Sequence, residues 1–248
     1  MNVFITGGTG GIGKALAERY IAAGHTVGIC GGSEIDFQRT FATPPPNLHF
    51  YPLDVTDRQA SLDIINQFCH GRLDLLIAAA GINDGTPVKG RPLDFDRAES
   101  IYHVNLLGVL HSVEAALANM LPHQHGRIAI LSSAAAIAGY PQTPAYCSSK
   151  AALVTLSESL SLRYADRGIS VSCLLPGYID TPLARATHPN LQKMPFVISV
   201  DKAADTIIRA INNKTLYLIF PWQVRWASRL IRLLPRRLFR FLCKWSEL

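Results

Sequence analysis

Tyr146 and Lys150 lie four residues apart in the stretch PAYCSSK, with only small side chains between them. Residues at this spacing share one face of a helix, and a neighbouring ammonium group favours the phenolate form of a tyrosine. The pair therefore predicts a tyrosine that can donate or accept a proton near neutral pH. The small neighbours leave space for a cofactor along the same face. The alternative is chance, since a surface tyrosine one turn before a lysine is common.

Two further polar side chains could act with this pair. Ser133 ends the apolar stretch GRIAILSS, where its hydroxyl could hydrogen-bond a substrate carbonyl oxygen. Asn105 lies midway along a long predicted helix. Asparagine is a poor helix former, so an interior one indicates a polar role. That role is in a site, in a helix kink or in a buried packing contact.

A glycine-rich stretch, TGGTGGIG, joins the first predicted strand to the first predicted helix. Glycine is needed where a backbone adopts positive φ or approaches a ligand closely, and the N–H groups that open a helix can bind a pyrophosphate. The stretch predicts a dinucleotide site; the alternative is a turn that holds no ligand. Three patterns fit its glycines: Gly7, Gly11 and Gly13; Gly8, Gly10 and Gly13; or Gly7, Gly10 and Gly13.

Asp54 ends the third predicted strand, in the stretch PLDVTD. A carboxylate at that edge of a sheet could accept a hydrogen bond from an adenine amino group. Alternatively, Asp54 caps the helix that follows, a role that Thr56 or Asp57 could fill equally well. The sequence leaves both interpretations open.

Short apolar stretches alternate with helical patterns along the chain. Near-continuous apolar strands separated by helices are typical of a parallel sheet covered on both faces. We therefore expect an α/β fold, a Rossmann-type doubly wound parallel sheet, in one domain over residues 1–221, followed by a basic amphipathic segment over 222–248. The predicted strands are 2–6, 26–30, 48–54, 73–81, 126–133, 169–177 and 215–220, and the predicted helices are 12–23, 58–70, 95–120, 146–165 and 201–212.

The composition suits a globular cytoplasmic protein. The chain has 248 residues, 48% of them hydrophobic, which is enough for a large core. No uncharged apolar run approaches the roughly 20 residues of a membrane span, and the N-terminal MNVFITGG has no basic region typical of a signal peptide. The five cysteines form no C-x-x-C pair, which predicts buried free thiols in a reducing compartment and no metal site.

The formal charge of +6 is concentrated in the C-terminal segment. Residues 222–248 carry seven basic side chains and one acidic side chain, whereas residues 1–221 carry 17 of each. Bulk charge therefore gives the main domain no reason to bind nucleic acid.

Together these motifs resemble the short-chain dehydrogenase/reductase family in its compact single-domain form. The resemblance covers residues 2–220, and its motifs occur in order at family-like spacing. They are T-G-x-x-x-G-x-G at 6–13, D-V at 54–55, AAG at 79–81, Asn105, Ser133, Y-x-x-x-K at 146–150 and PG at 176–177. The resemblance selects the first of the three glycine patterns, because relatives with the third have a longer C-terminal substrate region.

The resemblance implies an NAD(P)(H)-dependent oxidoreductase that interconverts a ketone or aldehyde and an alcohol by hydride transfer. In such an enzyme Tyr146 is the catalytic acid/base, Ser133 orients and polarises the carbonyl, and Asn105 positions a water in a proton relay. Lys150 lowers the tyrosine pKa and holds the nicotinamide ribose. The residues expected to contact the dinucleotide are Gly7, Gly10, Gly11, Ile12, Gly13, Ser33, Asp54, Val55, Ala80, Gly81, Tyr146, Lys150, Pro176, Gly177, Ile179 and Thr181.

One departure from the family pattern is AAAG at 78–81, where relatives often have N-N-A-G. Ala78 and Ala79 supply no side-chain amide, so we expect different local hydrogen bonding there. Ala80 and Gly81 remain as backbone neighbours of the cofactor.

A second departure concerns the choice of cofactor. Gly31 ends the second strand, where NAD-preferring relatives have an acid, and Gly32 stands where an arginine is usual. The missing acid leaves space for a 2′-phosphate, to which Ser33 could donate and Arg39 could reach. We therefore expect NADP rather than NAD.

The stretch 181–200 is long for a loop, and such loops are usually functional. We expect it to wall a substrate site whose candidate residues are Tyr140, Tyr178, Leu183, Met194 and Phe196. These side chains suggest an apolar small-molecule substrate. The family resemblance also implies a homodimer or homotetramer. Two rival functions are a non-catalytic dinucleotide sensor or scaffold, which would not need all four catalytic residues, and an acyl-carrier-protein ketoreductase that docks an acidic carrier on the basic tail.

The tail carries arginines at steps of three and four beside an apolar stripe, and Pro235 is predicted to divide it into two helices. One interpretation is a membrane-surface segment on a peripheral protein with a lipid-like substrate. The other is a helix that packs its apolar side on the domain or on a second subunit, with solvated arginines. The stripe consists of Trp222, Trp226, Leu230, Leu233 and Leu234.

Overall fold

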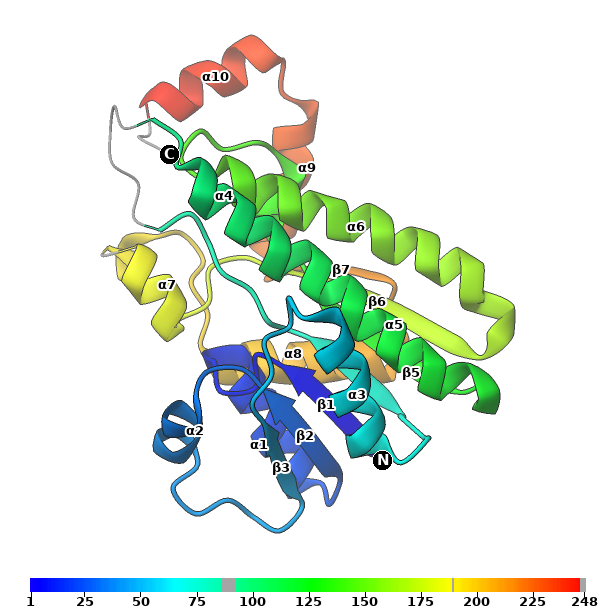
Figure 1. Cartoon of the computed structure of the whole chain (residues 1–248). Coiled ribbons are helices and arrows are strands. Elements are labelled where there is room, and N and C mark those ends of the chain that lie inside the picture. The colour runs from blue at the N-terminus through cyan, green and yellow to red at the C-terminus, as the bar shows by residue number, and fades with distance from the viewer. Residues whose placement is uncertain (86–91, 189, 246–248) are drawn as a thin grey trace.

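A single seven-stranded sheet forms the centre of the computed structural model, which describes residues 1–85, 92–188 and 190–245 (Figure 1). All strands are parallel, in the order β3-β2-β1-β4-β5-β6-β7. The sheet therefore grows in both directions from β1, which confirms the doubly wound arrangement. The strands are β1 Asn2–Thr6, β2 Thr26–Cys30, β3 Leu48–Tyr51, β4 Leu75–Ala78, β5 Gly126–Leu131, β6 Ile169–Pro176 and β7 Tyr217–Phe220.

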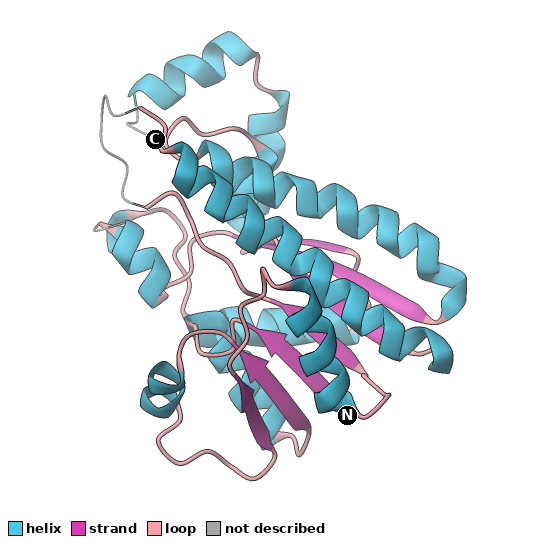
Figure 2. Ribbon diagram, viewed as in Figure 1, coloured by secondary structure: helices cyan, strands magenta, loops and turns pink. Residues whose placement is uncertain are grey.

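Helices cover both faces of the sheet (Figure 2). On one face α1 (Gly11–Ala22) and α8 (Val200–Asn212) form a core with β1 and β2. On the other face α3 (Arg58–Cys69), α5 (Gly108–Met120) and α6 (Pro144–Tyr164) form a second core with β4 and β5. The remaining α-helices of the described chain are α2 Glu34–Thr40, α4 Phe95–Tyr102, α7 Pro182–Thr187, α9 Trp222–Leu233 and α10 Arg236–Trp245.

The expected strands are all present, but several end earlier than predicted. The third strand stops at Tyr51, before Asp54, and the fourth covers only Leu75–Ala78. The predicted strands are longer because the apolar residues that follow β3 and β4 lie at the edge of the sheet and not in it. The sequence analysis missed two short helices: α2, and α7 within the stretch expected to be a loop.

The predicted helix 95–120 is confirmed, with an irregularity at its centre. It runs through α4, a π-helical turn η1 (His103–Leu107) and α5. By length and composition, the stretch Phe95–His123 could cross a membrane, but 56% of its most apolar 18-residue window is buried inside the protein. Because it packs on α3, β4 and α6, it serves here as a core helix.

The cysteine prediction is confirmed for four of the five thiols: Cys30, Cys69, Cys147 and Cys173 are free and buried. Cys243 is free and half-buried. Within residues 1–85, 92–188 and 190–245, no three His, Cys, Asp or Glu side chains are grouped so that they could hold a metal ion.

The tail divides at Pro235 into α9 and α10, as predicted. α9 lies on the β7 edge of the sheet, where Val224 joins a small apolar cluster with Leu175 and Ile219. α10 contacts the domain through Phe239, whose ring centroid lies 6.0 Å from that of Tyr140. Both helices lie at the end of the molecule where α4 begins (Figure 1).

The turn between β1 and α1 discriminates among the three glycine patterns. Gly7 has a φ of +70°, and a Cβ on Gly13 would lie 2.2 Å from the Gly7 carbonyl oxygen. A Cβ on Gly11 would lie 2.9 Å from the Thr181 side chain. Gly10 is extended at φ −83°, and a Cβ there would come no closer than 3.3 Å to the same oxygen. The turn therefore favours the pattern through Gly7, Gly11 and Gly13.

We expect Gly13→Ala to lower the free energy of unfolding by at least about 2 kcal/mol, because a backbone oxygen cannot move aside without opening the turn. Gly10→Ala is the matched control and should cost less than about 1 kcal/mol. Urea unfolding followed by circular dichroism measures both values. Equal losses in the two variants would contradict the close approach at Gly13.

Candidate active site

The predicted catalytic residues gather at the carboxyl edge of the sheet, where parallel sheets bind their ligands. Ser133 follows β5, Gly81 follows β4, and Asn105 lies in η1 beside them. Tyr146 and Lys150 lie on the first two turns of α6. Elements that are far apart in the sequence therefore supply one site.

Lys150 is buried, with 4% of its surface exposed, and anchors α6 to the end of β5. Its Nζ donates a hydrogen bond to the Leu131 carbonyl oxygen at 2.9 Å. In the opposite direction, the Ser132 hydroxyl donates to the Lys150 carbonyl oxygen at 2.7 Å. Desolvation disfavours the charged ammonium, so burial lowers the pKa of Lys150 to about 8.

Tyr146 lies close to this ammonium group: the Lys150 Nζ is 5.7 Å from the centroid of the phenol ring. The Tyr146 backbone N–H donates to Asp84 Oδ2 at 3.0 Å, so a carboxylate satisfies one of the free donors in the first turn of α6. Burial raises the pKa of the Tyr146 phenol, and a hydrogen bond with Ser133 lowers it. The sequence predicts that Lys150 lowers the pKa of Tyr146; in the structure desolvation of the phenol is the largest effect, and the lowering comes from Ser133.

Ser133 holds the position expected of a group that binds a substrate oxygen. It follows β5 and begins a 3-10 turn, η3 (Ala134–Ile137), by accepting a hydrogen bond from the Ala135 N–H at 3.1 Å. Its side chain also lies close enough to the Tyr146 phenol to lower the pKa of that group. Two neighbouring hydroxyl groups can bind the same carbonyl oxygen from adjacent directions.

Asn105 is fully buried, and its amide is held by backbone and side-chain partners. Its Oδ1 accepts from the Ile82 N–H at 2.8 Å, and its Nδ2 donates to the Ile82 carbonyl oxygen at 2.9 Å. Nδ2 also contacts the Ser149 hydroxyl at 3.2 Å. Asn105 therefore lies in an irregular turn of the helix and also makes buried polar contacts. These are two of the three roles that the sequence left open. Its part in a proton relay stays a prediction.

Gly81 joins these residues into one constellation. A Cβ at this position would lie 3.2 Å from Asn105 Oδ1 and 3.3 Å from Lys150 Nζ. The Asn105 amide and the Lys150 ammonium group therefore both lie close to the backbone that follows β4. The structure brings together Ser133, Tyr146, Lys150 and Asn105 around this point.

The AAAG departure is compensated by Thr6, the last residue of β1. Its hydroxyl oxygen accepts hydrogen bonds from the N–H groups of Ala79 and Ala80, both at 3.1 Å. A side chain from the neighbouring strand therefore fixes the backbone that follows β4, where local hydrogen bonding was expected to differ.

The start of α1 fits a pyrophosphate group. Its N-cap is Gly10, and no side chain of the described residues caps the helix, so backbone N–H groups remain available. Thr181 packs against Gly11 and caps α7 by accepting from the Ala184 N–H at 3.1 Å. The predicted dinucleotide residues flank this edge: Gly7, Gly10, Gly11, Ile12 and Gly13 after β1, Asp54 and Val55 after β3, Ala80 and Gly81 after β4, and Pro176, Gly177, Ile179 and Thr181 at the end of β6 and beyond.

Beyond β2, the structure reveals a carboxylate that the sequence analysis missed. Asp36 Oδ2 accepts from the Ser33 N–H at 2.9 Å and from its hydroxyl at 2.8 Å. These hydrogen bonds hold the pKa of Asp36 below its usual range. A Cβ on Gly32 would lie 3.3 Å from the same oxygen. The spacing S-x-x-D, a capping-box signature, could have identified this residue.

Asp54 does not cap the helix that follows it. Its Oδ1 accepts from the Thr56 N–H at 2.9 Å and from the Thr56 hydroxyl at 2.8 Å, while Asp57 caps α3. The N-cap alternative for Asp54 is therefore wrong. The adjacent Val55 is buried, and its carbonyl oxygen lies 3.0 Å from the His111 Nδ1.

Of the predicted substrate residues, Tyr140 and Tyr178 are partly buried, and burial raises the pKa of both phenols. Leu183 and Phe196 are about half exposed, at 46% and 48%, and Met194 is half-buried. The sequence analysis missed a hydrogen bond that holds α7 near the edge of the sheet. In this bond the Asn83 Nδ2, in the loop after β4, donates to the Thr187 Oγ1 at 3.2 Å.

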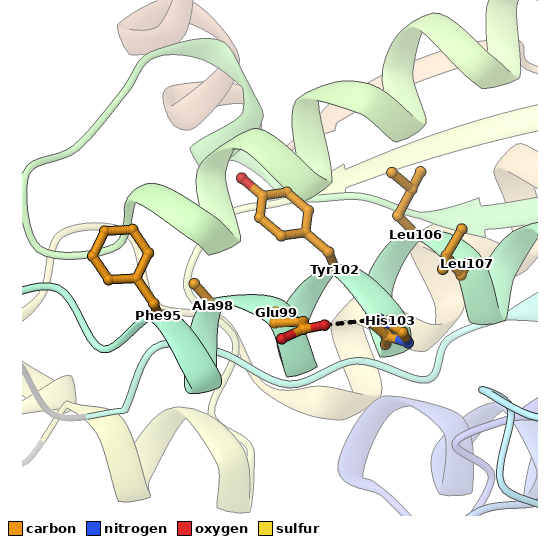
Figure 3. A pocket seen from close by; sticks show the side chains of 7 residues that line it. All are labelled: Phe95, Ala98, Glu99, Tyr102, His103, Leu106 and Leu107. Atoms are coloured by element: carbon orange, nitrogen blue, oxygen red, sulfur yellow. Dashed lines mark ion pairs between the residues drawn. The ribbon is translucent and has the colours of Figure 1, made fainter.

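A surface hollow of about 570 Å³ lies outside this constellation, along α4 and η1 (Figure 3). Its wall is mainly apolar, with a Glu99–His103 ion pair at 3.7 Å. Tyr102, at its centre, contacts the Ser148 hydroxyl of α6 at 2.7 Å. None of the four catalytic candidates lines it. The lining residues are Phe95, Ala98, Glu99, Tyr102, His103, Leu106 and Leu107.

Comparisons with known proteins agree with this geometry. A family model described as short chain dehydrogenase matches residues 1–192. An uncharacterized oxidoreductase from Myxococcus xanthus is 30% identical over 244 residues, which cover 95% of this chain and 93% of the relative. A 3-oxoacyl-(acyl-carrier-protein) reductase from Rickettsia conorii is 32% identical over 180 residues, which cover 72% and 73%.

Solved structures show the same fold. ElxO with NADP bound is 27% identical, with a TM-score of 0.77 over 88% of this chain and 96% of that one. A short-chain dehydrogenase from Streptomyces avermitilis is 23% identical, with a TM-score of 0.81 over 99% and 96%.

We expect Lys150→Met to stabilise the protein at pH 7 when no nucleotide is added. Below pH 8 both folded and unfolded wild-type chains carry a charged lysine, and desolvation then costs on the order of 3 kcal/mol in the folded state. Between pH 8 and 10.5 the folded chain releases this proton first, so wild-type stability rises with pH relative to the variant. Urea unfolding of both proteins at several pH values measures the gap. A gap that stays constant from pH 7 to 10 would contradict the lowered pKa.

Proposed function

Because this chain belongs to the short-chain dehydrogenase family, we propose that it interconverts a carbonyl compound and an alcohol with Ser133, Tyr146, Lys150 and Asn105 as its catalytic set. Family membership makes the protein an NAD(P)-dependent oxidoreductase. One observation carries the rest of the proposal. Ser133 lies beside the Tyr146 phenol and lowers its pKa, while Lys150 Nζ and Asn105 Oδ1 both lie close to the backbone at Gly81.

In this proposal, the chain's own residues handle the proton. When bound, the nicotinamide supplies or accepts the hydride at the carbonyl carbon. Ser133 and Tyr146 hydrogen-bond the carbonyl oxygen, and the Tyr146 hydroxyl donates its proton as negative charge develops there. The Lys150 ammonium then stabilises the phenolate that remains. A water held near Asn105 returns the proton, which is the role that the family resemblance implies.

The proposed substrate is apolar. The support is the character of the side chains beyond the catalytic residues: the aromatic rings of Tyr140 and Tyr178, and the apolar Leu183, Met194 and Phe196 near α7. Tyr178 and His188 form an edge-on ring contact at 5.3 Å, which orders one side of this region. The hydrogen bond between Asn83 and Thr187 orders the other side of this region.

We also propose that the protein is cytoplasmic and forms a homodimer or homotetramer. Four buried free thiols suit a reducing compartment. Exposed apolar side chains along α4 and α5, among them Phe95 at 75% and Leu110 at 37% exposure, provide a surface that a second copy could cover.

For the cofactor we propose NADP. Gly31 has a φ of +117° and packs against the Gly7 backbone, so the end of β2 has no place for an acid. ElxO, a similar protein, has been solved with NADP bound. The Asp36 carboxylate weakens this preference, since it lies beside the glycines after β2 and would repel a 2′-phosphate placed there.

A second candidate function is reduction of a carrier-bound 3-oxoacyl group. It is favoured by the similarity to acyl-carrier-protein reductases such as that of Rickettsia conorii. The two functions share the catalytic residues and differ in whether the carbonyl is presented free or on an acidic protein.

We expect NADPH to bind more tightly than NADH, and Asp36→Asn to strengthen NADPH binding about fivefold without changing NADH binding, because it removes a negative charge near the 2′-phosphate. The asparagine retains an acceptor for the Ser33 N–H, so α2 stays capped. Fluorescence titration of both nucleotides against both proteins gives the four dissociation constants. A strong wild-type preference for NADH would overturn the NADP proposal.

We expect Tyr146→Phe to reduce kcat by at least about a thousandfold, because no other group donates the proton, while nucleotide binding stays within about threefold of wild type. Turnover is measured with free apolar ketones and with a carrier-bound 3-oxoacyl substrate. Ser148→Ala, on the outer side of α6, is the matched control and should retain activity. Comparable turnover by Tyr146→Phe and wild type would rule out the catalytic assignment. Activity on the carrier-bound substrate alone would select the second candidate.

A further inference from the structure

α9 has two apolar faces, and only one of them contacts the domain. Val224 and the buried Ser228 belong to the inner face, which lies against the β7 edge of the sheet. With 3.6 residues per turn, a second set of side chains falls on the opposite side. This set, which we call the outer stripe, consists of Trp222, Trp226, Leu230 and Leu233, exposed at 68%, 55%, 63% and 81%.

A row of arginines runs beside the outer stripe. Arg225, Arg229 and Arg232 follow one another at steps of four and three, and the Arg229 guanidinium lies 4.9 Å from the centre of the Trp226 ring. The row borders a small hollow of about 160 Å³ between α9 and β7. In the part of the chain that the structure describes, none of the three forms an ion pair.

α10 repeats this combination. Leu238 and Phe241 are exposed at 45% and 61%, and the exposed arginines of the same helix are Arg236, Arg237 and Arg240. No aspartate or glutamate occurs between residues 222 and 246. The two helices therefore present apolar and basic side chains without any acidic group to neutralise them.

From this combination we propose that α9 and α10 dock the protein on an anionic lipid surface through the outer stripe and its arginines. Tryptophan and leucine would enter the boundary between headgroups and acyl chains, and the arginines would bind the anionic headgroups. A second copy fits less well, because a two-fold contact through this face would place the two arginine rows together with no acid between them. An acidic protein partner also matches the charge, but exposed tryptophan and leucine side chains spread over two helices favour a lipid surface.

The proposed membrane face is close to the catalytic edge. A Cβ on Gly177 would lie 2.8 Å from the Val224 Cγ2 of α9, so the inner face of the helix touches the turn that follows β6. Docking through the opposite face would therefore hold this turn about one helix diameter, roughly 10–12 Å, from the lipid. Phe239 of α10 contacts Tyr140, a proposed substrate residue. Entry of an apolar substrate from the bilayer is a further step, which rests on the proposed function.

The chain provides its own reporter for docking, because all three of its tryptophans, Trp222, Trp226 and Trp245, lie in the tail. The full-length protein is mixed with phosphatidylcholine vesicles with and without phosphatidylglycerol. We expect a blue shift of tryptophan emission and co-sedimentation with the anionic vesicles only. Both should weaken as salt is added, since headgroup attraction is screened.

Two double variants separate the apolar and basic contributions. Leu230→Ser with Leu233→Ser removes half of the outer stripe, and Arg229→Gln with Arg232→Gln removes two charges. Each should reduce the partition coefficient on anionic vesicles at least about tenfold. The matched controls are Leu162→Ser, at a leucine 77% exposed on α6, and Arg167→Gln, and both should bind as wild type does. Unchanged nucleotide binding confirms that each variant is folded.

Absence of vesicle binding by the full-length chain overturns the proposal, as does full binding by either double variant. If the leucine variant instead turns a dimer into a monomer, with no lipid binding in wild type, the outer stripe is an interface between copies. A shift produced by an acidic carrier protein and not by vesicles would assign this face to a protein partner. Vesicle binding requires no turnover, so its outcome is independent of the proposed reaction.

Discussion

A buried ammonium group constrains the whole candidate site. Lys150 lies where α6 crosses the end of β5, and its hydrogen bond to Leu131 fixes the helix against the strand. The loop after β4 passes close to the same nitrogen at Gly81, where an added Cβ would lie 3.3 Å from it. Asn105 holds the next residue of that loop, Ile82, through two hydrogen bonds. The positions of three elements are therefore linked to the accommodation of one charge away from water, which has a cost in stability.

The parts that the sequence predicts well depend on local patterns. Apolar runs bounded by turns predict the strands, and glycines at fixed spacing predict the turn after β1. Both can therefore be predicted from short stretches of sequence. Contacts between distant residues could not be identified in that way. Asn105 pairs with Ile82, and Asp84 meets the backbone of Tyr146 across 62 residues of chain. Their roles depend on how the sheet brings loops together, which no local window contains.

Asp36, the pKa of Tyr146 and the orientation of α9 differ in how far the sequence could predict them. Asp36 belongs to a local capping motif with Ser33 and could have been recognised from the spacing S-x-x-D. The pKa of Tyr146 could not have been anticipated, because it depends on the depth to which the fold buries the phenol. In the tail, the sequence predicts one apolar stripe, and the structure adds an inner face with Val224. The fold determines that the stripe with Val224 packs inward and the one with Trp226 faces outward.

The close contacts around Gly81 restrict the amino-acid substitutions that the protein can accept there. A Cβ there would lie 3.2 Å from Asn105 Oδ1 and 3.3 Å from Lys150 Nζ, so a substitution at Gly81 requires one of these two side chains to shift by a few tenths of an ångström. Because the three positions share these contacts, we expect substitutions at Gly81, Asn105 and Lys150 to have non-additive effects on stability.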